Sequence, residues 1–238
     1  MLTNSAPLAR APHARPPDDE YYEDCYADRL AAGRRLAERL QAYRGGRALV
    51  LALPPGGVIV GGELAHALRL PLDVLIAREF HAPLHPATVA GAISEGGGLC
   101  LNRTALRLPG VTPAAIWGEV QRARLDLVDL VLRYRGERSL PPMGRRPVIL
   151  VDDSLGDGLV QLAALQSLRH AHVHHCVVAT PRGTAPAVQR VARLADELVA
   201  LEVLDVAQPG DDFYWHRPLG DDETPALLER WRMRSVVR

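Results

Sequence analysis

The chain has 238 residues, of which 47% are hydrophobic and 24% are charged, with 28 basic and 28 acidic side chains and no formal net charge. This size suits one substantial core, so we expect a leader at residues 1–20 followed by a single domain at 21–238. The balanced charge argues against nucleic acid as a partner, because sequence-independent binding needs a basic face, and it favours a small molecule.

Cysteine and lysine usage narrow the chemistry further. Cys25, Cys100 and Cys176 are few, odd in number and far apart, so we expect free thiols in a reducing compartment. No apolar run is long enough to cross a membrane and the first residues lack the core of a secretion signal, so we expect no membrane partner and a cytoplasmic location. The chain contains no lysine, which excludes an amine nucleophile.

The first half of the chain alternates apolar runs with glycine and proline. Apolar residues recur at helical spacing between residues 26 and 43 and predict an amphipathic helix. Residues 48–53 predict a buried strand, and a Pro-Pro-Gly-Gly turn separates it from a helix at 58–68. A second strand is expected at 72–77. Two prolines indicate a loop at 78–90, and a hairpin is expected to pair 91–93 with 99–101.

The second half predicts a long helix and then further alternation. Thr112 and Pro113 form an N-cap and first-position pair, so a helix is expected to run from there to about Gly136. We then expect a strand at 148–151, a helix from 159, a strand at 173–179, a helix at 184–194 and a last strand at 197–201. Strands that alternate with helices predict an α/β fold with a doubly wound, mostly parallel sheet.

The most informative segment is Val148-Ile-Leu-Val-Asp-Asp-Ser-Leu-Gly-Asp-Gly-Leu-Val160. An apolar run without alternation predicts a strand buried on both faces. It ends in two carboxylates, Asp152 and Asp153, and a glycine-containing turn then leads into a helix. In a parallel sheet of this kind the ligand site lies beyond the carboxyl ends of the strands.

This segment resembles the signature of the type I phosphoribosyltransferases, which bind 5-phosphoribosyl-1-pyrophosphate (PRPP). The family pattern is an apolar strand, two acidic residues, a short spacer and a Thr-Gly-x-Thr-like loop that opens a helix. Asp152 and Asp153 match the acidic pair, and Gly158 matches the loop glycine. The resemblance covers the chain from about Tyr26 to the C-terminus. It implies the family's Rossmann-like fold with a small hairpin insertion and a C-terminal hood.

The resemblance also implies an activity and a set of site residues. The activity is PRPP-dependent transfer of phosphoribose to or from a nitrogenous base, with Mg²⁺ as cofactor. Asp152 and Asp153 would bind the ribose hydroxyls, and the same two residues are the candidates to bind the metal. The remaining positions are a phosphate loop of Gly156, Asp157, Gly158, Leu159 and Val160, a pyrophosphate group of Pro55, Gly56, Gly57 and Glu79, and Tyr214 and Trp215 as candidates to stack on the base. No residue is assigned a catalytic role.

Several of these positions depart from the family pattern. Pro55 stands where the family has an arginine, and Glu79 stands where it has a lysine. Asp157 and Val160 replace the loop threonines. A carboxylate ~4 Å from a phosphate charge costs about 4 kcal/mol at an effective permittivity of ~20, or roughly three orders of magnitude in affinity. The sequence therefore predicts weakened phosphate binding and makes a pseudoenzyme one outcome.

Asp157 leaves three interpretations open. Its side chain could cap the following helix by accepting backbone N–H groups. It could act as a built-in anion that fills the phosphate pocket. It could also join Asp152 and Asp153 as an oxygen ligand of Mg²⁺.

Three other groups also have two interpretations each. His172 and His174 would point to the same side of a strand, which permits a metal site, but we favour surface histidines. The segment at 180–184 could bind an anion, but we favour an ordinary turn with Thr184 as the N-cap of a helix. Tyr214 and Trp215 either stack on a planar ligand or help to pack the C-terminal helix.

Three functions follow from the residues. The first is the family's enzymatic reaction. The second is a non-catalytic ligand-binding or regulatory protein that recognises a nucleoside or a base. The third is a structural role in a homo-oligomer, with residues 99–101 or the N-terminal helix as the interface.

Overall fold

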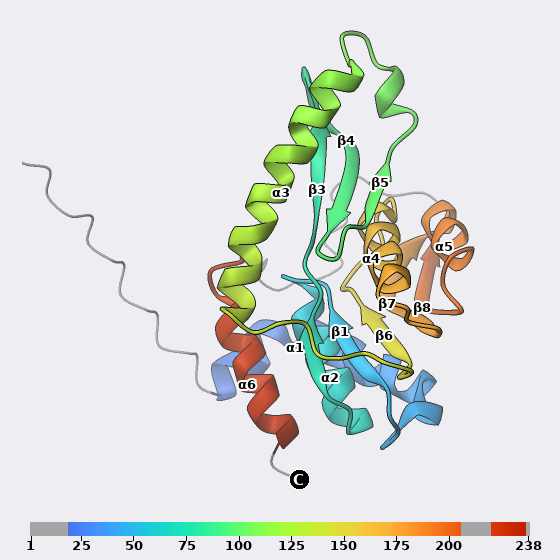
Figure 1. Ribbon diagram of the computed structural model, residues 1–238. Coiled ribbons are helices and arrows are strands. Elements are labelled where there is room, and N and C mark those ends of the chain that lie inside the picture. Colours follow the sequence, from blue (N-terminus) through green and yellow to red (C-terminus); the bar gives the residue numbers. More distant parts are fainter. Residues whose placement is uncertain (1–18, 206–219, 237–238) are drawn as a thin grey trace, which may run out of the picture.

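A computed structural model describes residues 19–205 and 220–236 (Figure 1). Most of the leader, together with Tyr214 and Trp215, lies outside the described residues. The described part contains a five-stranded sheet in the order β2-β1-β6-β7-β8, and all neighbouring strands in it are parallel. The strands are β1 (Leu49–Ala52), β2 (Leu72–Val74), β6 (Val148–Val151), β7 (Cys176–Thr184) and β8 (Glu197–Leu204).

Alternate residues of the central strands enter two separate apolar cores, which explains why these strands lack a polar alternation. Val50 and Ile149 belong to a core shared with the helices on one face, and Leu51 and Leu150 belong to a core with the helices on the other face. Helices on both faces confirm the predicted doubly wound α/β sheet. The first face carries α1 (Asp19–Arg39), α2 (Gly57–Leu68) and α6 (Thr224–Val236), and the second carries α4 (Leu159–His170) and α5 (Ala185–Ala192).

A second, three-stranded antiparallel sheet projects from the first (Figure 1). It consists of β3 (Ala77–Ala82), β4 (His85–Ser94) and β5 (Leu99–Leu101). The predicted hairpin between 91–93 and 99–101 is confirmed, but the prediction of a loop at 78–90 was wrong. Pro83 lies in the turn and Pro86 at the start of β4, beside a register irregularity, where proline leaves most of the ladder intact. The sheet lies between α3 (Pro113–Arg135) and α4.

Strand β7 lies further along the chain than predicted, at 176–184 instead of 173–179. Pro181 is tolerated because β7 pairs with β6 only as far as Ala179; beyond that point its neighbour on this side is an isolated bridge between Leu155 and Gly183, which requires no N–H from residue 181. The prediction of a turn at 180–184 was therefore wrong, although Thr184 does accept a hydrogen bond from the Ala187 N–H as the N-cap of α5. His172 and His174 precede the strand, so the prediction that they share one face of it was wrong.

The long helix is confirmed, with the Thr112 hydroxyl accepting from the Ala115 N–H at 3.2 Å and Gly136 at its end. Helix α1 begins at Asp19, earlier than its periodicity indicated. Two 3-10 turns complete the described elements, η1 (Gln41–Tyr43) and η2 (Ala105–Arg107). Within 19–205 and 220–236, no helix is both long and apolar enough to cross a membrane.

Candidate functional site

The acidic pair and the loop after β1 meet at the carboxyl edge of the parallel sheet. Asp152 and Asp153 follow directly on β6, next to the end of β1. A Cβ atom at Gly57 would lie 2.7 Å from the Val151 carbonyl oxygen, and one at Gly56 would overlap the Asp153 carboxylate. Only glycine allows the two loops to approach so closely. The structure thus places the predicted ribose and pyrophosphate positions side by side.

Asp153 is held by an arginine that the sequence did not point to. The Arg29 Nε atom of α1 lies 3.3 Å from Asp153 Oδ2. The Arg29 side chain is almost completely buried, whereas the Asp153 side chain is 20% exposed. An arginine is rarely buried unless it is paired. The signal in the sequence was weak, because Arg29 is one of several arginines along an amphipathic helix and no pattern links it to β6.

Asp152 is enclosed by hydrogen bonds from its neighbours. One carboxyl oxygen accepts from the Asp153 N–H at 2.8 Å, and the other accepts from Gln161 Nε2 of α4. Burial of the carboxyl group, followed by repulsion from Asp153, raises the pKa of Asp152 well above its ordinary value. Gln161 also donates to the Ser154 carbonyl at 3.3 Å, while its own Oε1 is buried without a hydrogen-bond partner. Gln161 was missed because it lies inside a helical pattern that reads as core.

The predicted phosphate loop leads into α4, and its own carboxylate occupies the start of the helix. Asp157 Oδ1 accepts a hydrogen bond from the Leu159 N–H at 2.9 Å, so it satisfies the first N–H group of α4, but the prediction that Asp157 is itself the N-cap residue was wrong by one position. The residue directly before the helix is Gly158, whose φ of +82° is in the left-handed region. A Cβ there would also lie 3.0 Å from a methyl group of Val191, so this position requires glycine.

The loop is also held from outside by α5 and its cap. The Thr184 hydroxyl donates to the Gly156 carbonyl at 3.0 Å, and Arg190 Nη1 donates to the Asp157 carbonyl at 2.8 Å. Leu159 is buried and Val160 is packed against the same apolar residues. These two residues therefore contribute packing rather than polar contacts.

The loop after β1 uses backbone donors internally. The Gly57 N–H donates to the Leu53 carbonyl at 3.0 Å, and the Val58 N–H donates to the Pro55 carbonyl at 3.3 Å. Pro55 itself has no N–H to offer and follows a cis peptide bond. The loop at Pro55, Gly56 and Gly57 thus has no charged side chain. The N–H groups of Gly57 and Val58 both donate to carbonyl groups nearby in the chain.

Arg78, which stands at the arginine of the family's Arg-Lys pair after the second strand, lies beside this loop and pairs with a charged neighbour. Arg78 Nη1 of β3 donates to the Pro54 carbonyl at 3.2 Å, and its other terminal nitrogen forms an ion pair with Asp221. The Tyr134 hydroxyl donates to the second oxygen of Asp221 at 2.6 Å. The sequence missed this arrangement because Arg78, Tyr134 and Asp221 are far apart along the chain.

Glu79 follows Arg78 on β3 and adds a negative charge close to the phosphate loop. Partial burial, followed by the charge of Asp157, raises the pKa of the Glu79 carboxyl, while His81 and Arg78 act in the opposite direction. The two carboxylates are close enough for their charges to interact, and a phosphate group close to Asp157 would meet both negative charges.

The acidic side chains at this edge of the sheet do not by themselves fit a metal ion. Among the described residues, no group of three His, Cys, Asp or Glu side chains is arranged to hold one. Asp157 caps α4, and Asp153 is paired with Arg29. The hypothesis that Asp152, Asp153 and Asp157 form an oxygen site for Mg²⁺ is therefore not supported, and a Mg²⁺ ion would depend on oxygen atoms from a ligand.

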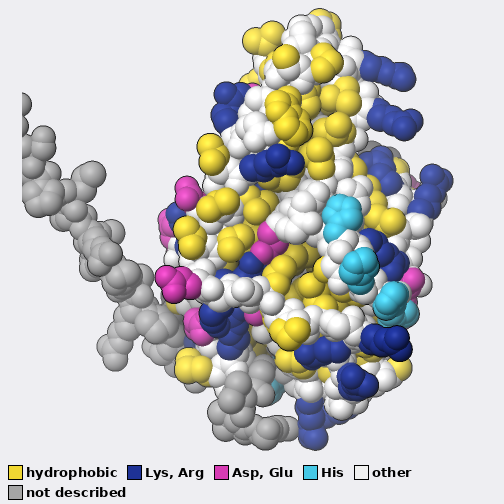
Figure 2. Space-filling model, in the orientation of Figure 1, with side chains coloured by type: hydrophobic (Ala, Val, Ile, Leu, Met, Phe, Trp, Pro, Cys, Tyr) yellow, Lys and Arg dark blue, Asp and Glu magenta, His cyan; other side chains and the backbone are white. Residues whose placement is uncertain are grey.

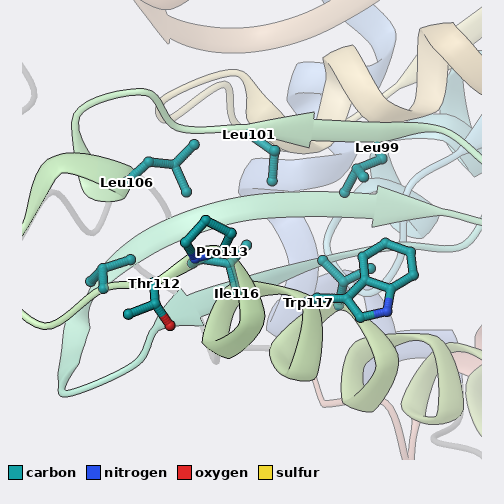
Figure 3. A pocket seen from close by; sticks show the side chains of 9 residues that line it. Leu99, Leu101, Leu106, Thr112, Pro113, Ile116 and Trp117 are labelled. Atoms are coloured by element: carbon teal, nitrogen blue, oxygen red, sulfur yellow. The ribbon is translucent and has the colours of Figure 1, made fainter.

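An apolar groove lies on the face of the small sheet that is turned towards α3, away from α4 (Figure 3). Leu99 and Leu101 of β5 line it together with residues of η2 and the start of α3, and its volume is about 310 Å³. Cys100, between them, packs instead with residues of α4, as expected from the alternation of a strand. The groove is thus separated from the phosphate loop by the sheet. In Figure 2, hydrophobic side chains extend over this part of the molecule.

Comparisons with known proteins agree with the fold and with the signature. No family model matches the chain. It is 35% identical over 206 residues to a protein named "Putative phosphoribosyl transferase" in two strains of Mycobacterium tuberculosis, a match that covers 86% of this chain and 46% of the relative. The chain thus spans about half the length of the curated relatives it matches. The solved structure of TT1426 from Thermus thermophilus is 35% identical, with a TM-score of 0.69, over 86% of this chain and 97% of that one.

The doubly wound sheet, with an acidic pair and a glycine loop at its carboxyl edge, defines an α/β protein of the phosphoribosyltransferase class. Together with the similarity to the mycobacterial protein, these features settle the assignment. The chain belongs to the type I phosphoribosyltransferase family.

Proposed function

We propose that this protein is a non-catalytic member of the family that binds a small, uncharged, hydroxyl-bearing ligand of the nucleoside class through Asp152 and Asp153. The observation that carries the proposal is the hydrogen bond from the Leu159 N–H to the Asp157 carboxylate at 2.9 Å. A helix N-terminus attracts an anion because its first N–H groups are unpaired and the helix dipole is positive there. In this protein an internal carboxylate takes that position.

The electrostatic cost of a phosphate at this position decides between the two functions. Two unit charges ~4 Å apart repel by about 4 kcal/mol at an effective permittivity of ~20. This corresponds to a roughly thousandfold loss of affinity. The negative charge of Glu79, which interacts with that of Asp157, adds to the repulsion. A ligand without phosphate groups avoids this cost.

The acidic pair supports binding of a ligand with neighbouring hydroxyl groups. Carboxylates accept hydrogen bonds from hydroxyls, and the close approach of Gly56 and Gly57 holds the pair at the edge of the sheet. Asp153 keeps part of its exposure beside Arg29, so its carboxylate remains near the surface of the cleft.

PRPP-dependent transfer is the second candidate, favoured by the acidic pair and by the three glycines that stand at matching positions of the loops, Gly56, Gly57 and Gly158. It would require a cation for pyrophosphate. Arg78, the cation beside the loop after β1, is paired with Asp221. The binding function proposed above needs no Mg²⁺.

Thermal unfolding with added ligands separates the candidates. We expect at least one of adenosine, inosine and uridine to raise the melting temperature of the full chain, and PRPP with Mg²⁺ to leave it unchanged. Asp153→Asn should abolish the nucleoside effect. Asp126→Asn is the matched control, because Asp126 is an exposed aspartate on α3. Stabilisation by micromolar PRPP, or a failure of all three nucleosides to bind, would contradict the proposal.

A further inference from the structure

Arg78 is a cation beside the loop after β1, and its guanidinium group already has two partners within the protein. One of its terminal nitrogens donates to the Pro54 carbonyl at 3.2 Å and the other pairs with the Asp221 carboxylate. Pro54 begins the loop whose Gly56 touches Asp153. The guanidinium therefore lies one loop away from the acidic pair, and with about a quarter of its side chain exposed it faces solvent from there.

Asp221 is fixed in place by its surroundings. Its two oxygens have different partners, since Oδ2 faces Arg78 and Oδ1 accepts from the Tyr134 hydroxyl at 2.6 Å. Burial and the bond to Asp221 raise the pKa of Tyr134, so the phenol remains a donor throughout the physiological range. The Thr224 hydroxyl donates to the Gly220 carbonyl at 2.6 Å and thereby fixes the turn that carries Asp221.

We propose that Asp221 acts as an internal anion that occupies the Arg78 site and so excludes pyrophosphate-like groups from the cleft. This inference rests on the proposed function and assigns a residue to its ligand selectivity. Asp157 supplies an internal carboxylate at the start of α4, and Asp221 supplies a second one at the loop after β1. Two built-in anions thus stand beside the two loops that bind anionic groups in the family.

A purely structural explanation would make Asp221 a clamp for the C-terminal helix. Other ion pairs already hold this part of the chain, because Arg232 of α6 pairs with Asp73 and Arg138 pairs with Glu229. Trp231 is also completely buried, against α2 at Gly62. Removing the charge of Asp221 should therefore leave α6 in place and free Arg78 for an external anion.

Isothermal titration calorimetry with sodium pyrophosphate, without divalent cations, tests this inference. We expect Asp221→Asn to bind pyrophosphate at least tenfold more tightly than the wild-type protein. The double variant Asp221→Asn with Arg78→Gln should lose that gain. Asp222→Asn is the matched control, since Asp222 pairs with Arg133 on the surface, and it should behave as the wild type.

Two results would overturn the inference. The first is pyrophosphate affinity of Asp221→Asn equal to that of the wild type, and the second is a gain that survives Arg78→Gln. Circular dichroism checks that each variant is folded, and Asp221→Ser, which removes the charge but leaves a hydroxyl oxygen that can accept a hydrogen bond, replaces Asp221→Asn if that variant does not fold. The outcome is independent of nucleoside binding by the wild type, so failure of the proposed function and failure of this inference are distinguishable.

Discussion

The Asp157 carboxylate accepts the Leu159 N–H at 2.9 Å, at the start of the helix that follows the acidic pair. The Asp157 side chain therefore has two effects. It stabilises the start of α4 by accepting a backbone N–H, and it places a negative charge at the phosphate loop, which affects ligand selectivity. The two effects can be separated by substitution.

Asp157→Asn keeps a capping oxygen but removes the charge, and Asp157→Thr also restores a hydroxyl. Because asparagine caps about as well as aspartate and threonine somewhat less well, we expect each variant to change the free energy of unfolding by no more than about 1 kcal/mol. Both should bind inorganic phosphate or PRPP more tightly than the wild type, by roughly 10- to 1,000-fold as the repulsion is removed. Calorimetry checks the affinity. Equal phosphate affinity in all three proteins would show that Asp157 does not determine selectivity.

Asp152→Asn tests the protonation of the acidic pair. Because the folded-state pKa of Asp152 is raised, the wild type loses stability as pH rises from the unfolded pKa, about 3.9, through the folded value, by up to about 1.4 kcal/mol per pH unit. Asparagine does not titrate, and the Gln161 amide can rotate so that its unpartnered Oε1 accepts from the new amide. Urea unfolding as a function of pH should show that the free energy of unfolding of the variant increases relative to that of the wild type as pH increases. A difference independent of pH would contradict the prediction.

Arg29→Gln removes the cation that pairs with the partly buried Asp153 carboxylate. We expect a loss of about 2–4 kcal/mol of stability at neutral pH, since breaking a buried ion pair is far more costly than its net contribution. Arg34→Gln is the control, because Arg34 on the same helix pairs with Glu63 from an exposed position, and it should cost less than about 1 kcal/mol. Chemical denaturation measures both. Equal losses would contradict the expectation that burial makes the Arg29–Asp153 pair more costly to break than an exposed one.

Gly158→Ala should destabilise the protein through the backbone. A φ of +82° and a Cβ only 3.0 Å from a Val191 methyl group make alanine strained at this position, so we expect a loss of about 1–3 kcal/mol. Gly118→Ala is the opposite case, because Gly118 lies inside α3 with open space around its Cβ position. It should gain about 0.5–1 kcal/mol from helix propensity. Loss of stability in both variants would contradict the backbone explanation.

Much of the fold could be predicted from the sequence because each element depends on local patterns. The apolar runs of β1 and β6, the cap at Thr112 and the glycines of the two loops each act within a few residues, and the structure has all of them where expected. The strand at 77–82 and the first half of the strand at 85–94 were missed because Pro83, in the turn between them, and Pro86 indicate a loop. The segment nevertheless forms strands, and the resulting sheet packs between α3 and α4. These tertiary contacts are not visible in the local sequence.

The partners of the site residues could not be predicted in the same way. Arg29 and Asp153 are separated by 124 positions, and Arg78 and Asp221 by 143. No periodicity links such residues, and an ion pair forms only once the fold brings them together. The sequence shows that Asp157 brings a negative charge to the phosphate loop, whereas only the structure shows that Asp221 brings a second one to Arg78.

The most direct test of the central claim is the affinity of the wild-type protein for PRPP in the presence of Mg²⁺, measured by calorimetry beside a nucleoside titration. We predict no saturable PRPP binding up to millimolar concentration, together with saturable binding of a nucleoside. A micromolar dissociation constant for PRPP would contradict the claim, because the Asp157 carboxylate could not then exclude a phosphate group from the cleft.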